Sequence, residues 1–242
     1  MKHVIAPVKN LRLLSQAGES LSSRDAGVPG IGLICGNTGF GKTTAAAWYA
    51  NHVNAVYVRA LALWKPSAML GAIMRELDAK PLQSCSAMMD FIIDRLALTG
   101  RPLFVDEADY LIGNKRLLES LRDLHDLSTM PLILIGMKDF RQRIMHREQL
   151  AGRISQWVEF KPADIDDARV LAETVCEVDV AADLIDELHK TTGGSMRGMV
   201  VGLSRIEAYA KKHGLKRINA TEWNGRAFVL SAAPQTRIAK VA

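Results

Sequence analysis

One segment of the sequence has the residue types and spacing that bind phosphate. Residues 36–43 read GNTGFGKT, the pattern Gly-x4-Gly-Lys-Thr, between an apolar run and a helix-forming run. Glycines let consecutive backbone N–H groups face an anion, and the amino end of a helix adds its positive dipole. The lysine of this pattern reaches the β- and γ-phosphates, and the threonine hydroxyl binds Mg²⁺. We therefore expect ATP and Mg²⁺ to bind here, at Gly36, Asn37, Thr38, Gly39, Phe40, Gly41, Lys42, Thr43 and Thr44.

A second candidate is a pair of adjacent carboxylates. The apolar run 102–106 (PLFVD) ends at Asp106, and Glu107 follows it. Downstream of a phosphate-binding loop, Asp106 would hold Mg²⁺ together with Thr43, and Glu107 would polarise the water that attacks the γ-phosphate. Kinases with such a loop usually lack the adjacent glutamate. The pair therefore favours an ATPase in which Lys42 and Glu107 are catalytic.

A sheet is needed to bring these residues together. Short apolar runs at 31–35, 55–59, 102–106, 132–136 and 156–160 alternate with helical patterns at 43–53, 68–77, 87–99, 115–127 and 139–147. This alternation predicts an α/β fold with a five-stranded parallel sheet flanked by helices. A short helix is expected over residues 10–21, ahead of the first strand.

The pattern changes after Pro162. Residues 164–177, 181–190, 196–213 and 221–232 have the apolar spacing of helices, and no further strand is expected. We predict an α/β ATPase domain over residues 1–162, and a small all-helical lid domain with a basic C-terminal tail over residues 163–242.

Composition limits the class of protein. The 242 residues include 31 basic and 26 acidic side chains, for a net charge of +5, and 48% are hydrophobic. These values exclude disorder, collagen and a coiled coil as descriptions of the whole chain. The scattered Cys35, Cys85 and Cys176 form no CxxC pair, which argues against a disulfide framework or a zinc site. Without a signal-peptide pattern or an apolar run of spanning length, we expect a cytoplasmic protein.

Taken together, these motifs resemble those of the AAA+ ATPases. Further along the chain, LAGRI at residues 150–154 is similar to the family's arginine-finger position, and TGGSMR at residues 192–197 is similar to its sensor-2 element. The resemblance implies that Arg153 reaches the γ-phosphate bound by a neighbouring subunit, and that Arg197 couples the lid to the nucleotide. Both would then be catalytic. The alternative for each is an exposed arginine at a helix end.

One position departs from the pattern of that family. The fourth strand commonly ends in a polar residue that aligns the attacking water, whereas Met137 and Lys138 follow the run 132–136 here. A thioether orients water poorly. Either Lys138 or Asp139 replaces the missing residue, or hydrolysis is slow and rises on assembly.

Within the family, the chain is most similar to the small transposition ATPases of the phage Mu B and Tn7-type regulator group. The similarity rests on the compact length and on DEADYL at residues 106–111. It implies sequence-tolerant binding of double-stranded DNA that depends on ATP, homo-oligomeric filaments or rings, and delivery of target DNA to a DDE transposase. A helicase loader or replication initiator shares these motifs. A nucleotide switch that binds a protein and not DNA is a third interpretation.

Basic residues after the second and third runs are candidates for DNA contact. In filament-forming relatives the segment after the second strand lines the inner surface, and here it contains Arg59 and Lys65. Lys115 and Arg116, after the third run, form a second candidate pair. Contacts with phosphates would give salt-sensitive binding. The alternative is that these side chains are simply solvated.

Overall fold

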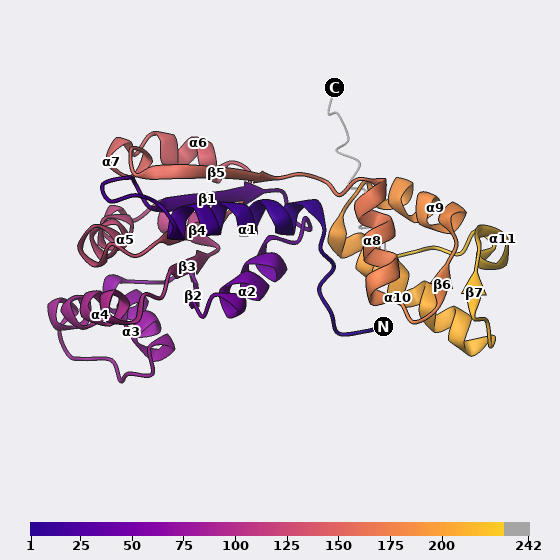
Figure 1. Cartoon of the computed structure of the whole chain (residues 1–242), viewed down its shortest axis with the longest axis horizontal. Helices are drawn as coiled ribbons and strands as arrows, with labels where there is room; N and C mark the ends of the chain where they lie inside the picture. Colours follow the sequence, from indigo (N-terminus) through magenta and orange to yellow (C-terminus); the bar gives the residue numbers. More distant parts are fainter. Residues whose placement is uncertain (230–242) are drawn as a thin grey trace, which may run out of the picture. The chain divides into compact units, whose positions relative to one another are not determined.

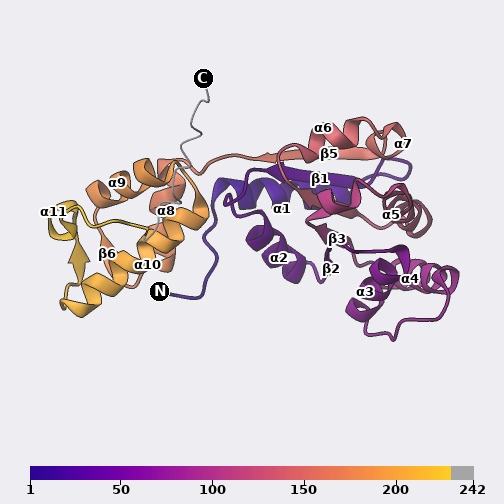
Figure 2. The ribbon, with the colours of Figure 1, turned by 180° about the vertical axis from the view of Figure 1, so that it is seen from behind.

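The fold is that of a computed structural model, which describes residues 1–229. The chain divides into two compact units. The sheet unit is Lys9–Lys161, and the helical unit joins Met1–Val8 to the residues from Pro162 onward. Figure 1 shows the elements of each unit, and Figure 2 shows them from behind.

A parallel sheet is the centre of the sheet unit. Its strands are β1 (Ile31–Gly36), β2 (Val56–Arg59), β3 (Leu103–Asp106), β4 (Leu132–Gly136) and β5 (Ile154–Phe160). They lie in the order β2-β3-β4-β1-β5, and every neighbouring pair is parallel. The predicted α/β fold with a five-stranded parallel sheet is confirmed. Because parallel strands end at the same side, the residues that follow β1, β3 and β4 meet there. We call this side the carboxyl edge and the opposite side the amino edge.

Helices cover the sheet and explain why its central strands are apolar throughout. In the sheet unit they are α1 (Lys9–Ser22), α2 (Lys42–His52), α3 (Pro66–Glu76), α4 (Cys85–Thr99), η1 (Ala108–Leu111, a 3₁₀ helix), α5 (Lys115–Ser128), α6 (Phe140–Met145) and α7 (Glu148–Ala151). Every residue of β1, β3 and β4 is buried. A strand that is buried on both faces has no polar side, so its sequence is a continuous apolar run.

The helix expected over residues 139–147 corresponds to α6, which ends at Met145; a second short helix, α7, begins at Glu148, beyond the predicted range. Arg147 has a non-helical backbone, with φ −109° and ψ 71°. Its side chain donates a hydrogen bond to the carbonyl of Ile112 at 3.1 Å. The break therefore lies at a residue whose side chain is held by another element.

The helical unit contains α8 (Ile165–Val175), α9 (Ala182–Thr192), α10 (Met196–Lys212) and α11 (Ala220–Trp223). It also contains β6 (Asp179–Val180) and β7 (Arg217–Ile218), which pair in parallel and which the prediction of an all-helical domain did not include. Two-residue strands are too short to show an alternating pattern.

The last predicted helix, over residues 221–232, ends early. Asn224 and Gly225 have φ values of 53° and 64°, which stop α11 after Trp223. Residues 230–232 of that prediction lie outside the described residues. Among residues 1–229, no helix is long and apolar enough to cross a membrane.

Candidate functional site

The glycine-rich loop lies at the carboxyl edge, between the end of β1 and the start of α2. Gly39 and Gly41 have φ values of 87° and 86°, a left-handed conformation that favours glycine. Gly36 packs against β5, where an added Cβ would lie 2.8 Å from the carbonyl oxygen of Phe160. Larger residues at these positions would strain the loop. All nine predicted nucleotide-binding residues, 36–44, lie at the end of β1, in this loop or in the first turn of α2.

The Lys42 side chain folds over this loop. Its Nζ donates hydrogen bonds to the carbonyl oxygens of Gly36 at 2.7 Å and of Asn37 at 3.0 Å. Burial lowers the pKa of Lys42, whereas the charges of Glu107 and Asp106 raise it. The ammonium is therefore close enough to interact electrostatically with Glu107, the predicted catalytic carboxylate, and with Asp106, the predicted Mg²⁺ ligand.

Asp106 is a buried carboxylate with a partner on each oxygen. It is only 2% exposed. Its Oδ1 accepts a hydrogen bond from the backbone N–H of Glu107, and its Oδ2 accepts one from the Tyr57 hydroxyl, both at 2.8 Å. The contact with Tyr57, on the neighbouring strand β2, was not expected from the sequence.

Glu107 has an unusual backbone and a basic partner. Its φ is 53°, in the left-handed region that residues other than glycine rarely adopt and that occurs often at functional sites. Its Oε1 is 3.1 Å from Nη2 of Arg59 at the end of β2. Arg59 is the first predicted DNA contact, and the structure pairs it with the predicted catalytic glutamate. The Arg59 side chain is still 62% exposed, so it can also meet a ligand.

The end of β4 contacts a residue other than Lys138 or Asp139, the two that the sequence suggested. The backbone N–H of Met137 donates to Oδ1 of Asp109 at 3.1 Å, and the Thr38 hydroxyl lies 3.5 Å from the Met137 sulfur. Lys138 and Asp139 are exposed. The carboxylate that contacts the backbone at the end of this strand is therefore that of Asp109. Its spacing, three residues after Asp106 across the turn of η1, is the signal that could have identified it.

These donors and acceptors fit a nucleotide with a divalent cation. The first-turn N–H groups of a helix have no intrahelical partner and can bind phosphate oxygens. The exposed Thr43 and the buried Asp106 offer the oxygen ligands that Mg²⁺ prefers. The glycine-rich loop, Lys42, Thr43 and the two carboxylates all lie at the carboxyl edge.

Arg153 lies at the amino edge, immediately before β5. In the sheet, Ile154 is opposite Ile31, whereas Phe160 is opposite Gly36 at the start of the glycine-rich loop. At about 3.3 Å per residue, this register separates Arg153 from the loop of its own chain by roughly 17–20 Å. Arg153 therefore cannot reach a phosphate in its own loop.

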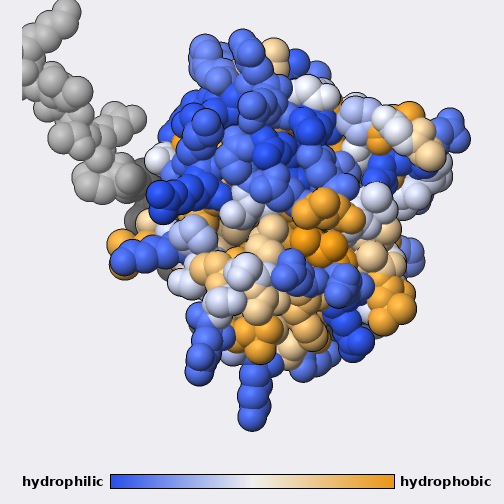
Figure 3. Space-filling view, turned by 90° about the vertical axis from the view of Figure 1, so that its left-hand side faces the viewer, coloured by the Kyte–Doolittle hydropathy of each residue, from blue (hydrophilic) through white to orange (hydrophobic). Residues whose placement is uncertain are grey.

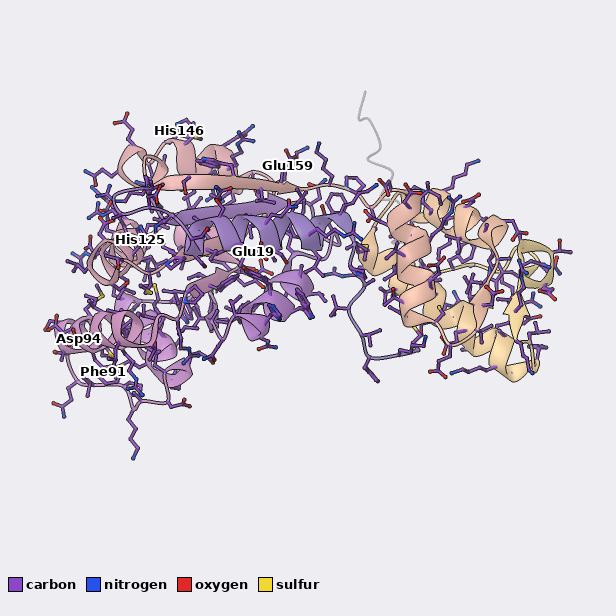
Figure 4. The ribbon with its side chains drawn as sticks, viewed as in Figure 1. Glu19, Phe91, Asp94, His125, His146 and Glu159 are labelled. Atoms are coloured by element: carbon purple, nitrogen blue, oxygen red, sulfur yellow. The ribbon has the colours of Figure 1, made fainter. Side chains whose placement is uncertain are left out.

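In the isolated chain, Arg153 is bound to α5. Its Nε lies 2.7 Å and 2.8 Å from the two carboxylate oxygens of Asp126, and its Nη1 donates to the carbonyl of Gln149 at 2.9 Å. His125, labelled on α5 in Figure 4, anchors the same turn through Nδ1 and the carbonyl of Met130 at 2.7 Å. Burial lowers the pKa of His125, which favours the neutral ring.

Figure 3 shows this end of the sheet unit, where a strongly hydrophilic region lies beside a hydrophobic one. Charged side chains of α5 form a network in which Arg122 contacts Glu119, Asp123 and Asp126. Leu98 and Leu127, near the ends of α4 and α5, are 78% and 64% exposed. Both charged and apolar groups are therefore open to another molecule here.

The other predicted DNA contacts are exposed. Lys65 immediately precedes α3, and Lys115 and Arg116 begin α5. The loop before Lys65 also exposes Leu63, to 93%. These helices follow β2 and β3, so the basic residues lie on the side of the sheet where those strands end.

Arg197 belongs to the helical unit. It is exposed in the first turn of α10, whose amino end is capped by the Ser195 hydroxyl accepting from the Gly198 N–H at 3.2 Å. The contacts of this unit assign no further role to Arg197.

Comparison with known proteins agrees with this geometry. Residues 25–144 match the family described as AAA domain. No curated protein matches the sequence. Structural similarity extends to the Aeropyrum pernix ORC2 protein in ADPNP-ADP complexes, with a TM-score of 0.70 and 17% identity over 90% of this chain and 67% of that one.

Two further structures are similar at the same identity of 17%. Cdc6p from Pyrobaculum aerophilum has a TM-score of 0.64, and covers 88% of this chain and 65% of its own. The A. pernix ORC1 protein in complex with DNA has a TM-score of 0.62, and the similarity covers 91% of this chain and 64% of that one. The present chain thus spans about two thirds of the length of these structures. At such low identity the similarity establishes the fold.

Proposed function

We propose that this chain, which contains an AAA domain, is an ATPase that binds DNA in its ATP-bound form and acts as a homo-oligomer. The observation that carries the proposal is that the loop around Lys42, the buried Asp106 and the adjacent Glu107 meet at one edge of the sheet. Hydrolysis of ATP requires a phosphate-binding loop, a ligand for Mg²⁺ and a base that polarises the attacking water.

Each residue then has a distinct role. Lys42 exchanges its two carbonyl partners for phosphate oxygens, Thr43 and Asp106 hold Mg²⁺, and Glu107 polarises the attacking water. Bound Mg²⁺ would neutralise charge on the β- and γ-phosphates. Arg153 would stabilise the transition state in the site of a neighbouring subunit, and Arg197 would bring the helical unit to the nucleotide.

Arg59 offers a link between hydrolysis and DNA. While Arg59 is paired with Glu107, one carboxylate oxygen is occupied and is less able to polarise water. A DNA phosphate that binds the exposed guanidinium would compete with Glu107 for it. Hydrolysis would then be slow in free protein and faster on DNA.

Two more specific roles share this chemistry. The similarity to Cdc6 and ORC structures supports a replication-initiator or helicase-loader role. Delivery of target DNA to a DDE transposase is supported only by the sequence resemblance. We therefore favour the initiator-like role. Stimulation of strand transfer when the protein is added to a DDE transposase would reverse this preference.

Replacing Lys65 with alanine should weaken DNA binding about equally for duplexes of different sequence. The measurement is the anisotropy of labelled duplexes with an unhydrolysed ATP analogue. Loss of one phosphate contact should reduce the steepness of the salt dependence by about 0.9 on a log–log plot. Arg12→Ala removes an exposed charge from α1 and serves as the matched control. If the analogue leaves the affinity for duplex DNA at low salt unchanged, the protein-binding switch is favoured instead.

Replacing Arg59 with alanine should raise ATP turnover without DNA and abolish its stimulation by DNA. The rise should reach up to about fivefold, since a partly exposed ion pair contributes roughly 1 kcal/mol or less. Steady-state phosphate release with and without duplex measures both effects, and Arg12→Ala is again the control. A lower DNA-free rate would instead show that Arg59 assists the reaction directly.

A further inference from the structure

The side chains of β2 point alternately toward the hydrophobic core and toward the acidic pair Asp106 and Glu107. Val56 and Val58 are 0% and 5% exposed and belong to the hydrophobic core. Tyr57 and Arg59 lie on the other face, since successive residues of a strand point to opposite sides. Tyr57 contacts Asp106 and Arg59 contacts Glu107. One face of β2 therefore carries a partner for each of the two acidic residues.

We propose that Tyr57 is a positioning residue that holds the Asp106 carboxylate in the orientation that binds Mg²⁺ with ATP. The inference rests on the proposed function. It gives the Tyr57 hydroxyl the role of orienting Asp106, which neither the glycine-rich loop nor Glu107 alone can do. Tyr57 touches neither phosphate nor water in this scheme and acts through Asp106.

Burial of Asp106 is the first step of the argument. At 2% exposure the carboxylate has little access to solvent, and a buried charge is stable only with hydrogen-bond donors around it. The Glu107 N–H satisfies Oδ1, and the Tyr57 hydroxyl satisfies Oδ2. Without the Tyr57 hydroxyl, Oδ2 would lose its hydrogen-bond donor. The carboxylate of Asp106 could then rotate out of its present orientation.

The donor and acceptor are defined by the chemistry of the pair. A phenol is neutral at about pH 7, so the Tyr57 hydroxyl keeps its proton and donates a hydrogen bond to Oδ2 of Asp106 at 2.8 Å. Each carboxylate oxygen can accept a second hydrogen bond or bind a cation. The hydroxyl thus fixes Asp106 and leaves lone pairs free for Mg²⁺ or its bound water.

Geometry also explains why a tyrosine is suited to this position. In the β2–β3 register, Tyr57 is opposite Phe104, and Asp106 lies two residues further along β3. The side chain must therefore cross diagonally toward the carboxyl edge, which a long aromatic side chain can do. A phenylalanine would fill the same space without the donor.

The test is Tyr57→Phe, with Tyr49→Phe as the matched control. Tyr49 is a buried tyrosine of α2 in the same unit, and its ring packs 6.1 Å from that of Phe104. Affinity for a fluorescent ATP analogue is titrated against Mg²⁺ and also measured in EDTA, and kcat is measured at saturating Mg²⁺. Loss of a residue that orients a metal ligand typically costs 10–100-fold in metal affinity.

We expect the Mg²⁺ concentration at half-saturation to rise about 10–100-fold in Tyr57→Phe. Affinity in EDTA should be unchanged, and kcat should largely recover at high Mg²⁺. Tyr49→Phe should behave like the wild type. An unchanged Mg²⁺ dependence, or an equal loss of affinity with and without Mg²⁺, would overturn the proposal. Wild-type protein that binds no nucleotide would overturn the proposed function itself.

Discussion

Glu107→Gln should bind ATP as tightly as the wild type and hydrolyse it about 10²–10⁴-fold more slowly. A base that polarises water contributes a factor of this size, and glutamine has nearly the same shape but no negative charge. Glu107 does not form the loop around Lys42, so binding should not depend on its charge. Affinity for a fluorescent ATP analogue and single-turnover phosphate release measure the two effects separately.

Lys42→Ala is the informative contrast, because it should abolish nucleotide binding itself. The glutamine variant should instead accumulate in the ATP-bound, assembled state, which electron microscopy of the protein with duplex DNA can show. Hydrolysis by Glu107→Gln at the wild-type rate would contradict the assignment. It would identify another group, with Asp109 the first candidate because it contacts the end of β4, as the base.

The fold was predictable because its three central strands, β1, β3 and β4, are fully buried. Continuous apolar runs separated by helical patterns indicate a parallel sheet covered on both faces. The same patterns contain little information about strand order, since the runs are alike in composition. The order β2-β3-β4-β1-β5 follows from long-range packing, and it is this order that places β3 next to both β2 and β4.

The candidate site was predictable where a local motif defines it. Lys42 and Thr43 follow a glycine loop whose spacing has one main use, and Asp106 ends an apolar run. The contacts of Tyr57 and Arg59 with the acidic pair depend on the register between β2 and β3. Register is a long-range property, so the sequence indicated only that Arg59 is basic and lies at the end of a strand.

Short elements were the least predictable part of the chain. The β6–β7 pair has two residues in each strand, and its pairing joins segments on either side of α9 and α10. Val180 and Ile218 are buried there, at 8% and 0% exposure. Their apolar side chains are consistent with either a helix or a strand, and only tertiary contacts select the strand.

Arg153→Ala should reduce turnover by about 10³-fold or more in the assembled protein, with little change in the affinity of a single subunit for ATP. A cation that neutralises developing charge on the γ-phosphate contributes a factor of this order. The register of β5 places Arg153 at the edge opposite its own loop. Under the proposed function, its contribution would be made in a neighbouring subunit, where a phosphate would replace Asp126 as the partner of the guanidinium.

Mixing two inactive variants tests this arrangement directly. The Arg153→Ala variant has an intact nucleotide-binding loop and lacks the arginine. The Lys42→Ala variant has Arg153 and cannot bind nucleotide. In mixed assemblies, Arg153 of a Lys42→Ala subunit can enter the intact site of an Arg153→Ala neighbour, so turnover should reappear. Arg143→Ala, which removes an exposed arginine 3.9 Å from Asp139 on α6, should leave the activity unchanged. Mixed assemblies that form and stay inactive would show that Arg153 does not act in a neighbouring site and only stabilises its own chain, through Asp126 and the Gln149 carbonyl.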